Sequence, residues 1–179
     1  MLNPKTHFSG AQRLLHWTMA VMIVTMLFVG VGMVTTVSER HTWLIALHKP
    51  LGIAILVLAL VRVAVRLRKG TPPLPGDMPV VQKLVAHLSH LALYGLMIAM
   101  PLLGWAMLSA GGYPVTLFGG FHLPAIAPAS AWWYARLHFA HTYLAYLLFI
   151  TVLGHLGAAL YHGLIRRDGV LSSMATSGR

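Results

Sequence analysis

Four long apolar runs, separated by shorter polar stretches, set the pattern of this chain. They cover residues 14–37, 43–67, 84–108 and 137–165, and three of the four contain no Asp, Glu, Lys or Arg. About 20 apolar residues in a helix are enough to cross the hydrocarbon core of a bilayer. Because lipid offers the backbone no hydrogen-bond partner, each run has to satisfy its own N–H and C=O groups as a helix. The pattern predicts an all-α integral membrane four-helix bundle, with residues 1–179 forming a single domain.

Composition agrees with a membrane protein and excludes several other classes. Hydrophobic residues make up 58% of the chain and charged residues 9%, which is too apolar for a soluble domain of 179 residues. The net charge of +10 does not indicate nucleic-acid binding, because the basic residues lie at the ends of the apolar runs rather than along one helix face. The expected surrounding is therefore membrane lipid. The absence of cysteine excludes disulfides, iron–sulfur ligation and covalent C-x-x-C-H haem attachment.

The distribution of Lys and Arg predicts which way the bundle faces. Ten of them lie in the N-terminal segment, the loop between the second and third runs, and the C-terminal segment: Lys5, Arg13, Arg62, Arg66, Arg68, Lys69, Lys83, Arg166, Arg167 and Arg179. Only Arg40, Lys49 and Arg136 lie on the other side. Because Lys and Arg concentrate in cytoplasmic loops, both termini are expected in the cytoplasm.

Histidine spacing within the runs is the main chemical signal. Ionisable groups inside a membrane span are costly and mark function. His141 and His155 are fourteen residues apart, close to four helical turns, so they share one helix face about 21 Å apart. At the same two depths lie His16, near the cytoplasmic start of the first run, and His48, near the outer start of the second. Depth alone pairs His16 with His155 and His48 with His141, as two axial ligand pairs for two non-covalently held haems.

The same fourteen-residue step suggests further contacts to a haem. Gly30 lies fourteen residues after His16, at the outer level, where a missing side chain would admit a macrocycle; its alternative role is helix packing. Arg62 lies fourteen residues after His48, at the inner level, and Arg13 lies one turn before His16. Both arginines are candidate partners for haem propionates.

With these residues in view, the chain resembles the bacterial cytochrome b561 family, small diheme proteins of the inner membrane. The resemblance covers nearly the whole chain and rests on Leu15-His16-Trp17, Leu47-His48, Arg62 with Arg66, Thr71-Pro72-Pro73, Ala86-His87-Leu88-Ser89-His90, and the series His141, His155, His162. It implies two haem b (protohaem IX) groups. It also implies iron ligands at the positions matching His16, His48, His141 and His155, the same pairs that depth predicts.

One branch of that family resembles superoxide oxidases, which implies oxidation of periplasmic superoxide and reduction of ubiquinone inside. Superoxide is an anion, so Lys49, Arg136 and Arg40 would attract it to the outer haem. On the inner side, His162 could pass protons to the quinone, or it could only snorkel to the membrane–water interface. Trp17 could pack on the quinone ring or serve as an aromatic anchor. His87 and His90 either border a cytoplasmic pocket or pack and snorkel.

Two other functions stay open from the sequence. The first is a cytochrome b subunit that oxidises quinol and passes electrons to a periplasmic redox partner, because such subunits share this helical core. The second is a non-catalytic protein, such as a haem-binding membrane scaffold or a small transporter. An absorption spectrum of the purified protein would distinguish a non-catalytic protein from the redox functions, because a colourless protein excludes the latter.

Overall fold

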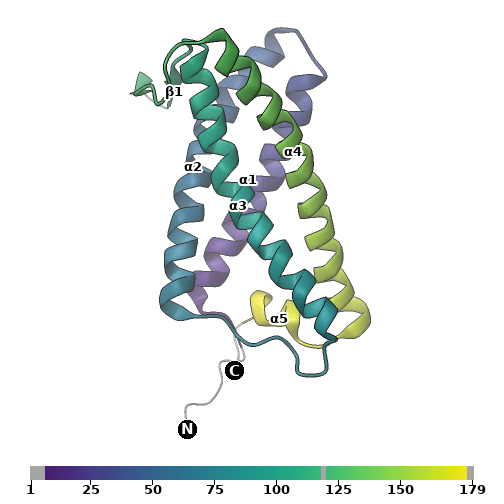
Figure 1. The fold of residues 1–179 in the computed structure, drawn as a ribbon. Helices are drawn as coiled ribbons and strands as arrows, with labels where there is room; N and C mark the ends of the chain where they lie inside the picture. The colour runs from purple at the N-terminus through teal and green to yellow at the C-terminus, as the bar shows by residue number, and fades with distance from the viewer. Residues whose placement is uncertain (1–6, 118–119, 177–179) are drawn as a thin grey trace.

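Four long helices form the body of the protein in a computed structural model that describes residues 7–117 and 120–176. They are α1 (Gly10–Val34), α2 (Glu39–Lys69), α3 (Val80–Ala110) and α4 (Ala131–Leu160), and Figure 1 shows them running along one common long axis. All four are long and apolar enough to cross a membrane. The predicted all-α membrane bundle is confirmed.

Two helices, α1 and α4, begin before their apolar runs with a serine side chain that caps the first turn. α1 begins at Gly10 rather than residue 14, since the Ser9 side chain accepts from the Gln12 N–H and the Gln12 side chain bonds back to the Ser9 N–H. α4 begins at Ala131 rather than residue 137, capped by Ser130. At its other end α4 continues into a π-helical turn, η2 (Tyr161–Arg166).

Three short elements distinguish the two ends of the bundle. The strands β1 (Val115–Thr116) and β2 (His122–Leu123) pair antiparallel after α3, and the helix α5 (Val170–Ala175) follows η2. Figure 1 shows β1 at one end, and α5 at the other beside the start of α1 and the α2–α3 linker. We name these the β1 end and the α5 end. The sequence-based prediction puts the α5 end in the cytoplasm.

A small apolar core occupies the middle of the bundle. It consists of Met19, Ile23, Ile55, Ala59, Leu93, Leu96, Met97, Met100 and Leu148. Extensive helix contacts are made between α1 and α2, α2 and α3, and α3 and α4. Among the described residues Leu148 is the one buried side chain of α4. α4 is therefore held mainly by α3, and the side that it turns toward α1 and α2 carries the histidines.

Candidate functional site

Two pairs of histidines meet across the bundle. His16 of α1 faces His155 of α4 with ring centroids 6.2 Å apart and ring planes at 69°. His48 of α2 faces His141 of α4 at the same 6.2 Å, with planes at 67°. The structure brings together the residues that depth along the helices pairs. The two histidine pairs connect α4 to α1 and to α2, although neither of these helices packs extensively against α4.

The spacing within each pair matches what one metal ion between two imidazoles requires. A metal–imidazole bond of about 2 Å, with a ring nitrogen about 1 Å from its ring centre, puts the two centroids roughly 6 Å apart. Histidine rings in direct contact with each other would have no reason to adopt the same 6.2 Å centroid distance in both pairs. The two pairs therefore fit a haem iron each, although ligation itself stays a prediction.

The two pairs are separated by the apolar core. Leu148 lies seven residues from His141 and seven from His155, so it sits midway along the face that carries both. At 1.5 Å per residue the two pairs are about 21 Å apart along α4. Each pair therefore lies near one end of the bundle, with apolar side chains between them.

The pair at the β1 end contains two buried ring nitrogens. The Nδ1 atoms of His48 and His141 are buried and have no hydrogen-bond partner within the described part of the chain. A Cβ on Gly104 of α3 would lie 3.3 Å from Cε1 of His141, so this glycine makes room for the imidazole. A Cβ on Gly30 of α1 would meet nothing within 4 Å, which leaves open the space that the haem hypothesis needs there.

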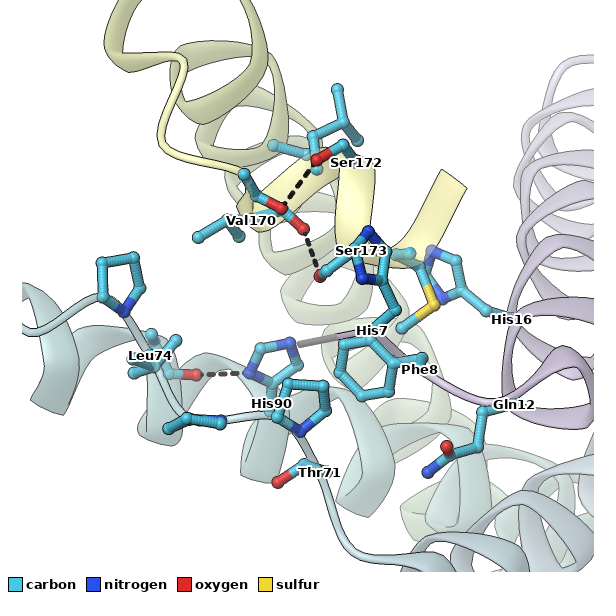
Figure 2. Close-up of a pocket in the computed structure, with 18 of the residues that line it drawn as sticks. His7, Phe8, Gln12, His16, Thr71, Leu74, His90, Val170, Ser172 and Ser173 are labelled. Carbon is cyan, nitrogen blue, oxygen red and sulfur yellow. Dashed lines mark hydrogen bonds between the residues drawn. The ribbon is translucent and has the colours of Figure 1, made fainter. Parts of the chain in front are cut away.

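The pair at the α5 end opens into a cavity of about 950 Å³. His16, His155 and His90 line it from α1, α4 and α3. Figure 2 shows His16 and His90 reaching it from different sides, with Ser172 and Ser173 of α5 along another side. The ring centroid of His90 lies 5.4 Å from that of His155, so a third histidine adjoins this pair.

Cations dominate the charge of this cavity. Arg62, Arg66 and Lys83 line it, whereas Asp168 is the only acid among its described lining residues. Arg62 Nε donates to the Tyr94 hydroxyl at 2.9 Å, and the guanidinium carbons of Arg62 and Arg66 lie 5.8 and 5.7 Å from the Tyr94 ring centroid. The cavity is thus suited to an anionic group, in agreement with Arg62 as the expected propionate partner.

Arg13 and Trp17 contact the C-terminal segment rather than the cavity. Arg13 Nη1 donates to the carbonyls of Phe8 and Thr176, both at 3.0 Å. Trp17 Nε1 donates to the Met174 carbonyl at 3.2 Å, while its ring packs edge-on against His16. Neither Arg13 nor Trp17 is among the described residues that line the cavity. Both side chains tie α1 to the segment that contains α5, and their expected contacts to propionate and quinone stay predictions.

His162 lies at a second, smaller cavity on the far side of α5. It lines about 400 Å³ with Arg167 and Leu171, and its Nδ1 is 2.6 Å from Oδ2 of Asp168. Partial desolvation alone would raise the pKa of Asp168, but hydrogen bonds from His162 and the Val170 N–H, together with the Arg166 cation, hold it below its usual value. The carboxylate is therefore ionised near neutrality, and the His162 ring donates to it from Nδ1.

The three predicted outer cations surround the β1 end. Lys49 Nζ donates to the Pro114 carbonyl at 3.3 Å, beside the ligand candidate His48. The Arg136 guanidinium stacks on the Trp132 ring at 4.0 Å and is exposed, as is Arg40 on the first turn of α2. These cations are accessible from the aqueous side of this end.

Sequence reasoning missed Tyr94 and Asp168 and left His90 undecided. A local signal existed for Tyr94, because it lies one turn after His90 and so shares its face of α3. Asp168 lies beyond the last apolar run, where the Asp168-Gly169 dipeptide is a local turn signal that the sequence analysis did not use.

Comparison with known proteins identifies relatives over almost the whole chain. The family model for prokaryotic cytochrome b561 matches residues 7–177. The chain is 34% identical to "Cytochrome b561 homolog 2" of Escherichia coli (strain K12) over 166 residues, which are 89% of this chain and 86% of the relative. It is also 34% identical to "Probable superoxide oxidase CybB" of Yersinia pestis over 138 residues, 76% of this chain and 77% of the relative. To "Cytochrome b561 homolog 1" of Escherichia coli (strain K12) it is 29% identical over 175 residues.

Proposed function

Because this chain belongs to the prokaryotic cytochrome b561 family, whose members transfer electrons in membranes, we propose that it oxidises periplasmic superoxide and reduces ubiquinone. One observation carries the proposal. The chain holds two histidine pairs at the same 6.2 Å spacing, one toward each end of the bundle. A relay that crosses a membrane needs two such centres, because a single one would leave one side out of reach.

The family implies b-type haem, and the proposed ligands of two haems are His16 with His155 and His48 with His141. Haem iron bound there would supply reversible one-electron chemistry, and a histidine pair would hold each iron. The chain's own contribution is to fix the imidazoles at the required spacing and to exclude water from the space between the pairs. The apolar core around Leu148 supports the second role.

Superoxide is the donor that best suits the β1 end. The relative from Yersinia pestis is named a probable superoxide oxidase. Lys49, Arg136 and Arg40 offer positive charge near the pair at this end, and that charge raises the encounter rate of a small anion. Each superoxide releases one electron and leaves as O₂, so two superoxide anions supply the two electrons that one ubiquinone accepts.

Ubiquinone is the acceptor that best suits the cavity at the α5 end. The part of the cavity next to His16 and His155 would hold the inner haem, and the quinone headgroup would bind in its aqueous-side part, between residues 71–76 and residues 168–174. Reduction to the quinol also takes up two protons, which have to come from the aqueous side. In this proposal His162 delivers them by way of Asp168, which is hydrogen-bonded to His162 and also lines the large cavity.

A stopped-flow experiment tests this function. Oxidised protein is mixed with superoxide in the presence and absence of a short-chain ubiquinone, and the haem absorption bands are followed. We expect reduction by superoxide, and then reoxidation only when quinone is present. Protein that superoxide leaves oxidised, but that a quinol reduces, would instead favour the quinol-oxidising cytochrome subunit. A colourless protein would refute every redox function.

A further inference from the structure

Two segments from distant parts of the sequence form the aqueous-side walls of the large cavity. Residues 71–76 of the α2–α3 linker line one side, and residues 168–174, which include the start of α5, line another. Neither segment is part of a membrane-spanning helix. Their positions therefore depend on side-chain contacts rather than on the backbone hydrogen bonds of a long helix.

Arg166, at the end of η2, contacts the α5 wall and the residue that directly follows the linker wall. Its Nη2 is 2.7 Å from Oδ2 of Asp77 in the linker, and its Nε is 2.9 Å from Oδ2 of Asp168 before α5. Its Nη1 donates to Gln82 at the start of α3 at 3.2 Å. All three nitrogen atoms of the guanidinium are in use, each toward a different segment. Only a guanidinium offers this fork of donors.

The choice of partners is informative because acids are scarce in this chain. It contains three acidic residues in a sequence with a net charge of +10, and two of the three contact Arg166. The side chain of Arg166 is 17% exposed and that of Asp168 is 9% exposed, whereas Asp77 is 78% exposed. The ion pair with Asp168 is therefore the stronger one, and the ion pair with Asp77 is weakened by solvent.

The backbone of the α5 wall needs a side-chain contact such as the Arg166–Asp168 ion pair to hold its position. Between η2 and α5 the chain reverses through two left-handed residues, Arg167 at φ 53° and Gly169 at φ 82°. Only a six-residue helix follows, too short to hold its position by its own hydrogen bonds. Asp168, between them, accepts from Arg166 and His162 on one oxygen and from the Val170 N–H at 3.2 Å on the other.

We propose that Arg166 is a positioning residue that holds the linker wall and the α5 wall of the cavity in place for the acceptor. This inference rests on the proposed function, since it assigns the aqueous-side part of the cavity to a quinone. Arg166 is not among the described residues that line the cavity, so it acts through Asp77 and Asp168. Removing it should loosen the site and weaken quinone binding, while the histidine pairs and the entry of electrons at the β1 end stay unchanged.

The test compares Arg166→Gln with Arg167→Gln, a matched control. Arg167 carries the same charge one residue later, is exposed, and donates to the Leu164 carbonyl of its own turn. In Arg166→Gln we expect the KM for quinone to rise about tenfold, the lower end of the effect of a lost charged hydrogen bond. The haem spectra and the rate of reduction by superoxide should stay as in wild type. Arg166→Lys should keep the charge and still raise KM, because an ammonium cannot reach three segments.

A second measurement does not depend on turnover. The chain has no cysteine, and a Cβ on Gly163 would lie 3.4 Å from the Leu171 Cβ, close to the spacing of a disulfide. A Gly163→Cys/Leu171→Cys protein should therefore cross-link under a mild oxidant when α5 is docked. We expect slower cross-linking when Arg166→Gln is added, and no change when Arg167→Gln is added.

The possible failures are distinguishable. Wild-type protein without quinone-dependent reoxidation would refute the proposed function and, with it, this inference. Wild-type protein that turns over quinone, beside an Arg166→Gln variant with unchanged KM or a KM equal to that of Arg167→Gln, would overturn the inference alone. A loss of kcat with unchanged KM would also overturn it, because a loosened binding site predicts the opposite.

Discussion

Replacing Gly104 of α3 should weaken the outer haem and spare the inner one. A Cβ at this position would lie 3.3 Å from Cε1 and 3.6 Å from Nδ1 of His141. Ordinary contacts between such atoms are about 3.5–4.0 Å, so the methyl of Gly104→Ala displaces the imidazole by a few tenths of an ångström. The two further methyls of Gly104→Val demand a larger movement.

His141 has little freedom to make that movement. Its ring centroid is 6.2 Å from that of His48, the spacing that would let both imidazoles hold one iron, so a shift of His141 would move it out of that spacing. Overpacking of this kind costs about 1–3 kcal/mol, which corresponds to about a 5- to 140-fold weaker haem site. Against this, replacing a glycine by alanine favours an isolated helix by about 1 kcal/mol. The alanine variant should therefore be mildly affected and the valine variant strongly.

The measurement is haem content per chain, together with the rate at which haem is lost to an excess of a haem-scavenging protein. Gly95 is a matched control on the same helix, because it is exposed and a Cβ there meets nothing within 4 Å. We expect Gly104→Val to fall from about two haems to about one, with fast loss of the outer haem, while Gly95→Val keeps both. Equal haem retention in the two valine variants would show that His141 is free to move, and would refute the reasoning about the iron spacing.

Three further predictions concern the two ends of the relay. His48→Ala should remove the outer haem and His155→Ala the inner one, which difference spectra would show; a His48→Ala protein with both haems and unchanged spectra would contradict the pairing. His162→Ala should retain both haems and slow quinone-dependent reoxidation in stopped flow, whereas loss of a haem or unchanged reoxidation would remove it from proton delivery. Reduction by superoxide should slow as ionic strength rises and slow further in Lys49→Glu/Arg136→Glu, since exposed charges are screened beyond about 8–10 Å. Reduction by a neutral quinol should respond to neither change, and equal salt sensitivity for both donors would exclude an electrostatic entrance.

Much of the fold and the pairing of the histidines followed from the sequence because each depends on a local rule. Runs of apolar residues long enough to cross a bilayer require helices there, whatever their neighbours are. The helical repeat then places His141 and His155 on one face, and the direction of each helix sets the depth of His16 and His48. In the structure these residues form the two pairs that were predicted from their depth along the helices.

The surroundings of the inner pair depended on contacts between segments far apart in the sequence. Trp17 and Arg13 are next to a ligand candidate in the sequence, yet their side chains bond to the carbonyls of Met174 and Thr176. His162 continues the histidine face of α4, but the chain reverses after Arg166 and α5 separates His162 from the large cavity. No periodicity encodes such a reversal, because it is set by two left-handed residues and a few ion pairs.

The sequence by itself determined where the two histidine pairs can lie, since apolar length and helical period act within each segment. The tertiary structure alone decided what encloses the large cavity, since the charges of Asp77, Arg166 and Asp168 acquire their partners only after the linker, the end of α4 and α5 come together. The physical difference is one of range. Backbone hydrogen bonds and burial in lipid are satisfied locally, whereas an ion pair over 89 positions exists only in the folded chain.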